Sequence, residues 1–236
     1  MGKSLSGRTA LVTGSSRGVG HHVAVALAQQ GCSRVICHGR SEAACRRTAD
    51  LIAQAGAESV IAAAELSDPA QVEALAQKVL ALGGVDILYN NAAIMPPERK
   101  KPEDQVLGDW TLAFQVNIFA MMILTSRLLP PMRAKGWGRI VNVTSRIDKT
   151  PQLAPYGASK WAVDKWSDDL NAAVRADGII VSTMDPGWLR TDMGGPNGEN
   201  APETVLPGAL VPVLLPDDAP GAQFFHAQLL RDFKIQ

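Results

Sequence analysis

The chain has 236 residues, enough for one large α/β domain or two small ones with a substantial core. Its 23 basic and 23 acidic side chains cancel, which argues against a nucleic-acid partner. The longest uncharged apolar stretch, residues 110–126, contains Gln115 and Asn117, so we expect a buried helix and no membrane span, and the N-terminus lacks the apolar core of a signal peptide. Three cysteines, an odd number, fit a reduced cytoplasmic protein without disulfides or a metal site.

Strand and helix patterns alternate along the chain. Short apolar, β-branched runs predict strands at residues 9–13, 33–39, 58–64, 85–91, 138–145, 179–187 and, with a weaker pattern, 222–227. Helical spacing of apolar residues predicts helices at 19–31, 42–55, 68–82, 104–134 and 155–176. This alternation without an internal repeat predicts a single α/β domain over residues 1–236, with a Rossmann-type doubly wound, seven-stranded and mostly parallel sheet covered by helices on both faces. The Pro- and Gly-rich residues 194–210 follow the sixth strand, and we expect a substrate loop there.

A glycine-rich stretch, TGSSRGVG at residues 13–20, joins the first expected strand to the first helix. Gly14 permits a tight turn, and Gly18 and Gly20 let the backbone approach a pyrophosphate at the helix N-terminus, where N–H groups and the helix dipole favour negative charge. An ordinary strand–helix turn can carry the same glycines, but the first βα junction of an α/β domain is the context that dinucleotide binding requires. The stretch predicts a dinucleotide site, with Ser16, Arg17 and Val19 among its contacts.

Arginine stands where an acidic, ribose-binding residue would end the second strand. The stretch CHGRS at residues 37–41 carries Arg40, and Arg17 lies within the glycine loop. Two guanidinium groups suit a 2′-phosphate by charge and by fork geometry. Two solvated surface arginines would give the same pattern, and Glu42 is close enough to bind a ribose hydroxyl instead. We expect NADP(H) in preference to NAD(H).

Tyr156 precedes Lys160 by four residues in YGASK, so the two side chains share one face of the expected helix 155–176. That spacing is common in helices for reasons unrelated to chemistry. A tyrosine, however, titrates at about 10 and needs a neighbouring cation to move protons at neutral pH. A lysine one turn later supplies this charge at a fixed distance, and Pro155 presets the first helical turn. The pair is therefore a candidate acid–base unit.

Six short motifs follow one another in this α/β alternation: TGSSRGVG, NNAA at residues 90–93, GDWTLAFQVN at 108–117, GRIVNVTS at 138–145, YGASK, and DPGWLRTDM at 185–193. With all six in this order, the sequence resembles the short-chain dehydrogenase/reductase family over nearly its whole length. Its C-terminal part is similar to carbonyl reductase-type members. The resemblance implies an NADPH-dependent oxidoreductase that reduces a ketone or aldehyde by hydride transfer.

The same resemblance implies a role for each motif residue. Tyr156 would be the general acid, Lys160 would lower its pKa and bind the nicotinamide ribose, and Ser145 would hold the substrate oxygen. Asn117 would interrupt the long helix and position a water that relays protons to Lys160. Further cofactor contacts are implied for Glu65, Leu66, Asn90, Ala92, Pro186, Gly187, Leu189 and Thr191.

Alternatives remain at the sequence level. The same residues would serve a dehydrogenase that oxidises a sugar, steroid or hydroxyacid, and the fold would also suit a non-catalytic nucleotide sensor. Ala93 and Glu65 depart from the family's usual glycine and aspartate. The loop at residues 146–155 is also short, so Thr144 would take the place of Ser145 if the loop kept Ser145 from facing Tyr156. We expect a small-molecule substrate and a homodimer or homotetramer built on helices 104–134 and 155–176.

Overall fold

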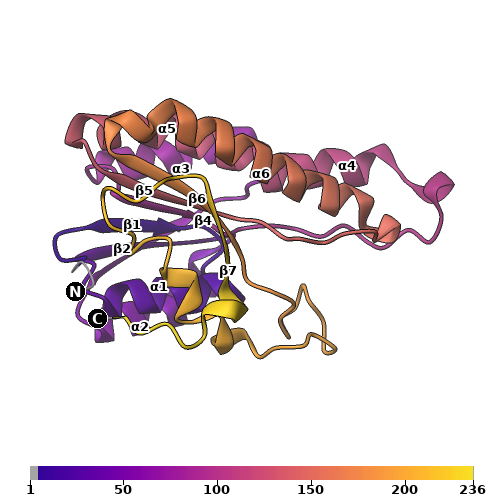
Figure 1. The fold of residues 1–236 in the computed structure, drawn as a ribbon, viewed down its shortest axis with the longest axis horizontal. Coiled ribbons are helices and arrows are strands. Elements are labelled where there is room, and N and C mark those ends of the chain that lie inside the picture. The colour runs from indigo at the N-terminus through magenta and orange to yellow at the C-terminus, as the bar shows by residue number, and fades with distance from the viewer. Residues whose placement is uncertain (1–4, 236) are drawn as a thin grey trace.

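The computed structural model describes residues 5–235, and Figure 1 shows a sheet between two layers of helices. The strands and helices are β1 Thr9–Val12, α1 Gly18–Gln29, β2 Arg34–Gly39, α2 Glu42–Gln54, β3 Glu58–Ala63, α3 Pro69–Ala81, β4 Ile87–Asn90, α4 Leu107–Phe114, α5 Ala120–Lys135, β5 Gly138–Val143, α6 Ala154–Val174, β6 Ile179–Asp185 and β7 Gln223–His226. The expected alternation is confirmed, with element ends that differ from the expected ones by a few residues.

The seven strands form one sheet in the order β3-β2-β1-β4-β5-β6-β7, and each neighbouring pair among them is parallel. The expected doubly wound, Rossmann-type sheet is therefore confirmed. The chain adds β2 and β3 on one side of β1 and then returns to place β4 on the other side. In such sheets, ligands bind at this reversal, outside the carboxyl ends of the strands.

Both faces of the sheet are buried, as the continuous apolar runs predicted. Consecutive residues of β1 point to opposite faces: Ala10 and Val12 pack into the core under α1 and α2, and Leu11 packs into the core under α3 and α5. Figure 1 shows α1 and α2 below the sheet and α3, α4, α5 and α6 above it. The two layers fix the strand ends that carry the motif residues.

The long helix expected at residues 104–134 is interrupted. A π-helical turn at Gln115–Phe119 separates α4 from α5, and Asn117 lies inside this turn. Such turns are rare and are frequent at functional sites. By length and composition alone, the stretch Leu107–Lys135 could cross a membrane, but 56% of its most apolar window is buried inside the protein, as in the core helix of a soluble fold.

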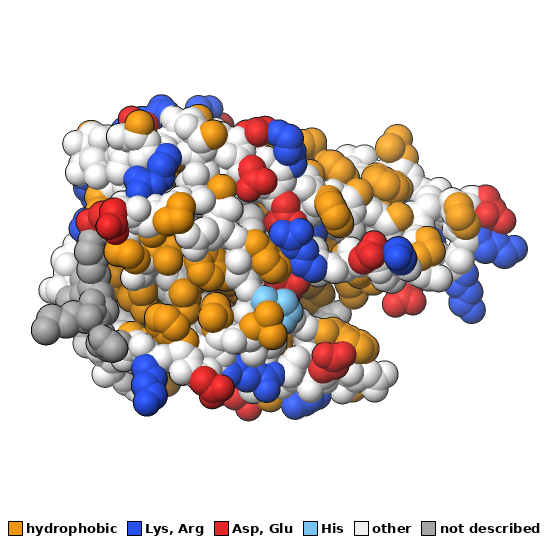
Figure 2. Space-filling view, viewed as in Figure 1, with side chains coloured by type: hydrophobic (Ala, Val, Ile, Leu, Met, Phe, Trp, Pro, Cys, Tyr) orange, Lys and Arg blue, Asp and Glu red, His pale blue; other side chains and the backbone are white. Residues whose placement is uncertain are grey.

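The segment between β6 and β7 folds back on the end of β6. Its longest regular pieces near the expected loop at 194–210 are two 3₁₀ turns, Pro202–Val205 and Gly208–Leu210. The Trp188 indole donates a hydrogen bond to the Gly194 carbonyl, 2.8 Å away, within this segment. Figure 2 shows hydrophobic side chains gathered in the left half of the visible face, where Figure 1 shows the golden segment that leads to β7.

Candidate active site

The end of β5 and the start of α6 bring Ser145, Tyr156 and Lys160 together. Lys160 is buried, and its Nζ donates a 2.8 Å hydrogen bond to the Val143 carbonyl and lies 5.8 Å from the centre of the Tyr156 ring. The Ser145 side chain lies close enough to Tyr156 to favour its phenolate. Thr144 instead bonds to the Lys160 carbonyl. The short 146–155 loop therefore lets Ser145 face Tyr156, and Thr144 does not take its place.

Burial dominates the titration of both groups. It raises the pKa of Tyr156 to about 12, although the Ser145 side chain favours the phenolate and lowers this pKa, and the charge of Asp185 raises it further. Burial also lowers the pKa of Lys160 to about 8, against the attraction of Asp164 and Asp185. The pKa of Tyr156 is therefore raised on balance, whereas the sequence analysis expected Lys160 to lower it. The phenol keeps its proton at neutral pH in this site.

The Asn117 side chain connects the π-helical turn to the segment after β4 and to α6 by hydrogen bonds. Its Oδ1 accepts a 2.8 Å hydrogen bond from the Ile94 amide, and its Nδ2 donates to the Ile94 carbonyl at 3.0 Å. The same Nδ2 donates a 2.9 Å bond to Ser159 on α6. The π-helical turn thus aims Asn117 at the segment after β4 and at α6. The expected interruption of the long helix by Asn117 is confirmed.

The glycine loop packs closely on the segment after β4. A Cβ on Gly14 would lie 2.8 Å from the Ala92 Cα, and a Cβ on Gly20 would lie 2.5 Å from the Gly14 carbonyl oxygen. Gly14 and Gly18 also have φ values of 64° and 58°, where glycine is favoured. A Cβ on Gly18 would approach the Thr191 methyl group at 3.5 Å, so the loop faces the segment after β6. These glycines allow the close backbone approach that the sequence predicted.

Three polar residues that the sequence analysis missed hold this loop. The Thr13 hydroxyl accepts hydrogen bonds from the amides of Asn91 and Ala92, each 3.0 Å long. The Asn91 side chain donates to the carbonyls of Thr13 and Gly14. Buried His38 accepts from the Gly14 amide through Nδ1 at 3.1 Å, so its Nε2–H donates to the Ala64 carbonyl at 3.2 Å. The sequence signal that could have identified these three residues is a polar side chain at or just after the end of a predicted strand.

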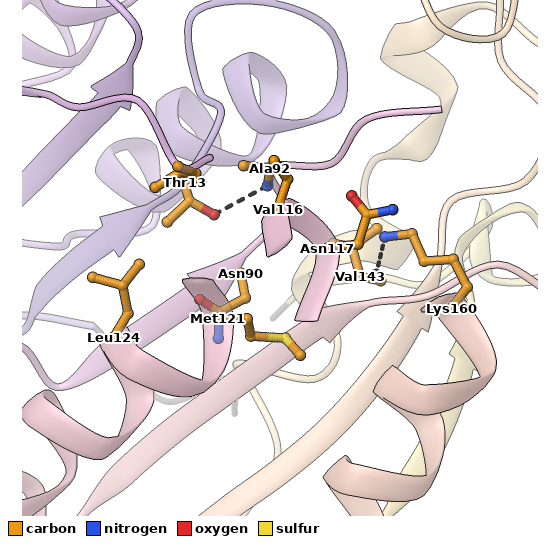
Figure 3. Close-up of a pocket in the computed structure, with 10 residues that line it drawn as sticks. Thr13, Asn90, Ala92, Val116, Asn117, Met121, Leu124, Val143 and Lys160 are labelled. Carbon is orange, nitrogen blue, oxygen red and sulfur yellow. Dashed lines mark hydrogen bonds between the residues drawn. The ribbon is translucent and has the colours of Figure 1, made fainter. Parts of the chain in front are cut away.

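A small pocket lies between the glycine loop and the π-helical turn (Figure 3). Asn90, Asn117 and Lys160 bring polar groups to it, and the Asn90 Oδ1 is buried without a hydrogen-bond partner among the described residues. Orphaned polar atoms at a strand end suit a polar ligand. The lining residues are Thr13, Leu66, Asn90, Ala92, Val116, Asn117, Met121, Leu124, Val143 and Lys160. The residues present therefore fit a dinucleotide along this edge.

The remaining predicted cofactor residues border the same edge. Glu65 turns back to accept a hydrogen bond from the Ser67 amide at 3.0 Å, while its neighbour Leu66 enters the pocket. Ser16 and Val19 are half-buried in the glycine loop, with Val19 packed against the core. After β6, half-buried Pro186, Gly187 and Thr191 and buried Leu189 form the facing segment.

The two arginines expected to bind a 2′-phosphate, Arg17 and Arg40, both have exposed side chains. Arg17 forms a 2.8 Å ion pair with Asp192, and both side chains are exposed. Arg40 is exposed just beyond β2, and Glu42 is the exposed first residue of α2. The pair between Arg17 and Asp192 joins the glycine loop to the segment after β6.

Comparisons with known proteins match this arrangement. A family model described as short chain dehydrogenase matches residues 8–202. The ketoacyl reductase HetN of Nostoc sp. is 32% identical over 194 residues, which cover 79% of this chain and 65% of the relative, so the chain spans less than two thirds of that protein's length. The 3-oxoacyl-(acyl-carrier-protein) reductase FabG of Vibrio cholerae is 33% identical over 196 residues, or 80% of this chain and 77% of the relative.

A solved structure supports the same relationship. A putative NAD(P)-dependent gluconate 5-dehydrogenase from Beutenbergia cavernae, with bound NADP, is 29% identical with a TM-score of 0.85, and the match covers 98% of this chain and 99% of that one. The family model spans the glycine loop, the Ser145–Tyr156–Lys160 group and the segment after β6. The chain therefore belongs to the short-chain dehydrogenase family of oxidoreductases.

Proposed function

We propose that this protein is an NADPH-dependent reductase that converts a ketone or an aldehyde into an alcohol. The observation that carries the proposal is the grouping of half-buried Tyr156 with the Ser145 side chain and buried Lys160, in which burial raises the pKa of Tyr156 to about 12. A phenol with this pKa keeps its proton at neutral pH and can donate it to an oxygen that becomes basic. Carbonyl reduction needs such a donor, because the oxygen gains negative charge as the carbon gains hydride.

Each residue of the group has a task in this reaction. The nicotinamide, when bound, supplies the hydride. Ser145 and Tyr156 hold the carbonyl oxygen, and Tyr156 transfers its proton to that oxygen. Lys160, whose pKa is lowered by burial to about 8, is mostly protonated at neutral pH and stabilises the resulting tyrosinate. Asn117 holds the water that returns a proton through Lys160.

The preference for NADPH rests on Arg17 and Arg40. Their side chains are exposed on the glycine loop and just after β2, the two places that flank an adenosine ribose in this fold. The bound NADP in the Beutenbergia cavernae structure gives further support. The described cysteines Cys32, Cys37 and Cys45 are all free, which supports a reducing, cytoplasmic setting. Residues 1–236 would form one domain.

A dehydrogenase that oxidises a secondary alcohol is the second candidate, because the same residues serve the reverse direction. The solved relative from Beutenbergia cavernae, a putative gluconate 5-dehydrogenase, favours it. A non-catalytic nucleotide sensor is the least supported reading, because Asn117, Ser145, Tyr156 and Lys160 are all present. In either direction, the loop at 194–210 would border the small-molecule substrate.

The test is the loss of NADPH absorbance when the protein meets a panel of ketones and aldehydes, with NADP and the corresponding alcohols as the reverse assay. Tyr156→Phe should lower turnover by about three orders of magnitude and leave NADPH binding nearly intact, because only the transferable proton is lost. Lys160→Ala should weaken both NADPH binding and turnover. Full activity in Tyr156→Phe would reject the assignment of the acid. Turnover in the alcohol assay alone would favour the dehydrogenase.

A further inference from the structure

We propose that Asp185 is a positioning residue of this site, whose carboxylate fixes the backbone around Ser145 and the segment at residues 186–191 to the end of β6. The inference rests on the proposed function, in which Ser145 and Tyr156 hold the carbonyl oxygen. Asp185 is the last residue of β6 and is only 6% exposed. A carboxylate at this depth needs strong hydrogen-bond donors, and here backbone amides supply them.

The first of these bonds continues the strand pairing beyond the end of β5. The last ladder bond runs from the Thr144 amide to the Met184 carbonyl at 2.9 Å. Two residues later, the Arg146 amide donates to the Asp185 Oδ2 at 2.8 Å, across 39 positions of the sequence. Ser145 is therefore held on both sides by bonds to β6. Without the second bond, the chain after Thr144 would be free to move Ser145 away from Tyr156.

The second bond acts on the segment that follows β6. The Asp185 Oδ1 accepts from the Gly187 amide at 2.8 Å. Gly187 has a φ of 78°, and a Cβ there would lie 2.7 Å from the Gln228 side chain, so the turn is closely packed. Gln228 in turn donates to the Pro186 carbonyl at 2.8 Å. One carboxylate thus sets the distance between the Ser145 backbone and the Gly187 turn, which border the same edge of the sheet.

The charge of Asp185 also reaches the acid–base pair. The titratable groups around it come from three segments: Tyr156, Lys160 and Asp164 from α6, Arg146 from the segment after β5, and His226 from β7, which is its register partner. The Arg146 guanidinium lies over the Phe224 ring at 4.0 Å and 4.0 Å from Asp164. Within residues 5–235, Asp185 forms no ion pair within 4.0 Å, so its charge remains available to raise the pKa of both Tyr156 and Lys160.

Two substitutions separate the geometric effect from the charge. Asp185→Asn keeps one acceptor oxygen but removes the charge, and Asp185→Ala removes both hydrogen bonds. We expect kcat to fall about 10-fold to 100-fold in Asp185→Ala and about threefold to tenfold in Asp185→Asn, because displacement of a reacting group by about 1 Å has costs of this size. Both substitutions remove a negative charge near Tyr156 and Lys160. The alkaline limb of the kcat profile should therefore shift to lower pH in both, by roughly half a unit or more.

A second measurement needs neither substrate nor cofactor. The chain has two tyrosines, and burial raises the pKa of fully buried Tyr89 well above its usual range. Phenolate absorbance at about pH 11 therefore reports mainly on Tyr156, whose pKa burial raises to about 12. Asp185→Asn should show a larger phenolate fraction than wild type at that pH. If wild type reduces no carbonyl, this measurement still tests the effect of Asp185, and only the proposed function fails.

Asp86→Asn is the control, since Asp86 is a buried carboxylate that accepts a hydrogen bond from a backbone amide as Asp185 does but is ion-paired with Lys135 at 2.9 Å. Asp86 is also buried, and its Oδ2 accepts a 2.8 Å bond from the Thr9 amide near the start of the sheet strands, far along the sheet from Tyr156. This variant should lose thermal stability like Asp185→Asn but keep the wild-type alkaline limb and phenolate fraction. An Asp185→Asn protein whose alkaline limb and phenolate fraction equal those of wild type would overturn the proposal, whether or not Asp185→Ala folds.

Discussion

Asn117 and Ser159 join the interrupted helix to α6 by a 2.9 Å hydrogen bond from the Asn117 Nδ2 to the Ser159 Oγ. The Ser159 hydroxyl donates onward to the Tyr156 carbonyl at 2.7 Å. The π-helical turn is thereby connected to the backbone of Tyr156. Asn117 also forms hydrogen bonds with both backbone groups of Ile94, so its side chain aligns three segments.

The first prediction compares removal of either partner. Asn117→Ala loses three hydrogen bonds and leaves the Ile94 backbone groups unpaired, so unfolding should cost about 3 kcal/mol less and kcat should fall more than about tenfold. Ser159→Ala loses the single bond between the side chains and its own bond to Tyr156. The free energy of unfolding of this variant should fall by about 1 kcal/mol, and most activity should remain. Urea unfolding and kcat measure both effects. Equal losses in the two variants would contradict the assigned role of Asn117.

The local parts of the site could be predicted from the sequence, and the non-local parts could not. Tyr156 and Lys160 share a face because helix geometry fixes a spacing of four residues, and Gly14 follows from the backbone demands of one turn. The bond from Arg146 to Asp185 joins residues 39 positions apart, and no local pattern encodes it. Burial of Tyr156 depends on the whole packed site, so the direction of its pKa could not be read from the nearby lysine alone.

The second prediction concerns stability in acid. Burial lowers the pKa of His38 from 6.5 to about 4, so between these values the unfolded chain binds a proton that the folded protein does not. The free energy of unfolding that depends on neutral His38 is fully present above pH 6.5. It falls by up to about 3 kcal/mol as the pH falls toward 4. His38→Asn keeps an acceptor for the Gly14 amide without this titration. Denaturation at several pH values should show a smaller acid loss in the variant, and parallel curves would contradict the prediction.

The third prediction concerns assembly. Large apolar side chains are exposed on the layer formed by α4, the π-helical turn and α6, including Leu107, Phe119 and Trp161, which is 55% exposed. Apolar patches of this kind often cover one another in symmetric dimers. Light scattering at micromolar concentration should give a dimer or larger species, and Trp161→Lys should weaken it. Trp188→Lys is the control, because Trp188 is exposed to a similar extent, 52%, but lies outside these helices. A monomeric wild-type mass would contradict the prediction.

The ion pair between Arg17 and Asp192 bears on the choice of cofactor. The two side chains meet at 2.8 Å, and both are more than half exposed, so the pair contributes little to stability. Its position at the glycine loop means that Arg17 has to exchange Asp192 for a 2′-phosphate, whereas Arg40 forms no ion pair within 4.0 Å among residues 5–235. Removal of Asp192 should therefore strengthen NADPH binding without changing NADH binding, by up to about fivefold.

The last prediction tests that exchange together with the expected preference. A charge-assisted hydrogen bond from each arginine, at about 1.5–3 kcal/mol, would give kcat/KM for NADPH about two to three powers of ten above that for NADH. Arg40→Asp should reverse the preference, because a carboxylate repels the phosphate and accepts from a free ribose hydroxyl. Asp192→Asn should instead raise the ratio of kcat/KM for NADPH to kcat/KM for NADH. Equal kcat/KM values for both cofactors in wild type would mean that the arginines face solvent and that Glu42 or the backbone binds the ribose.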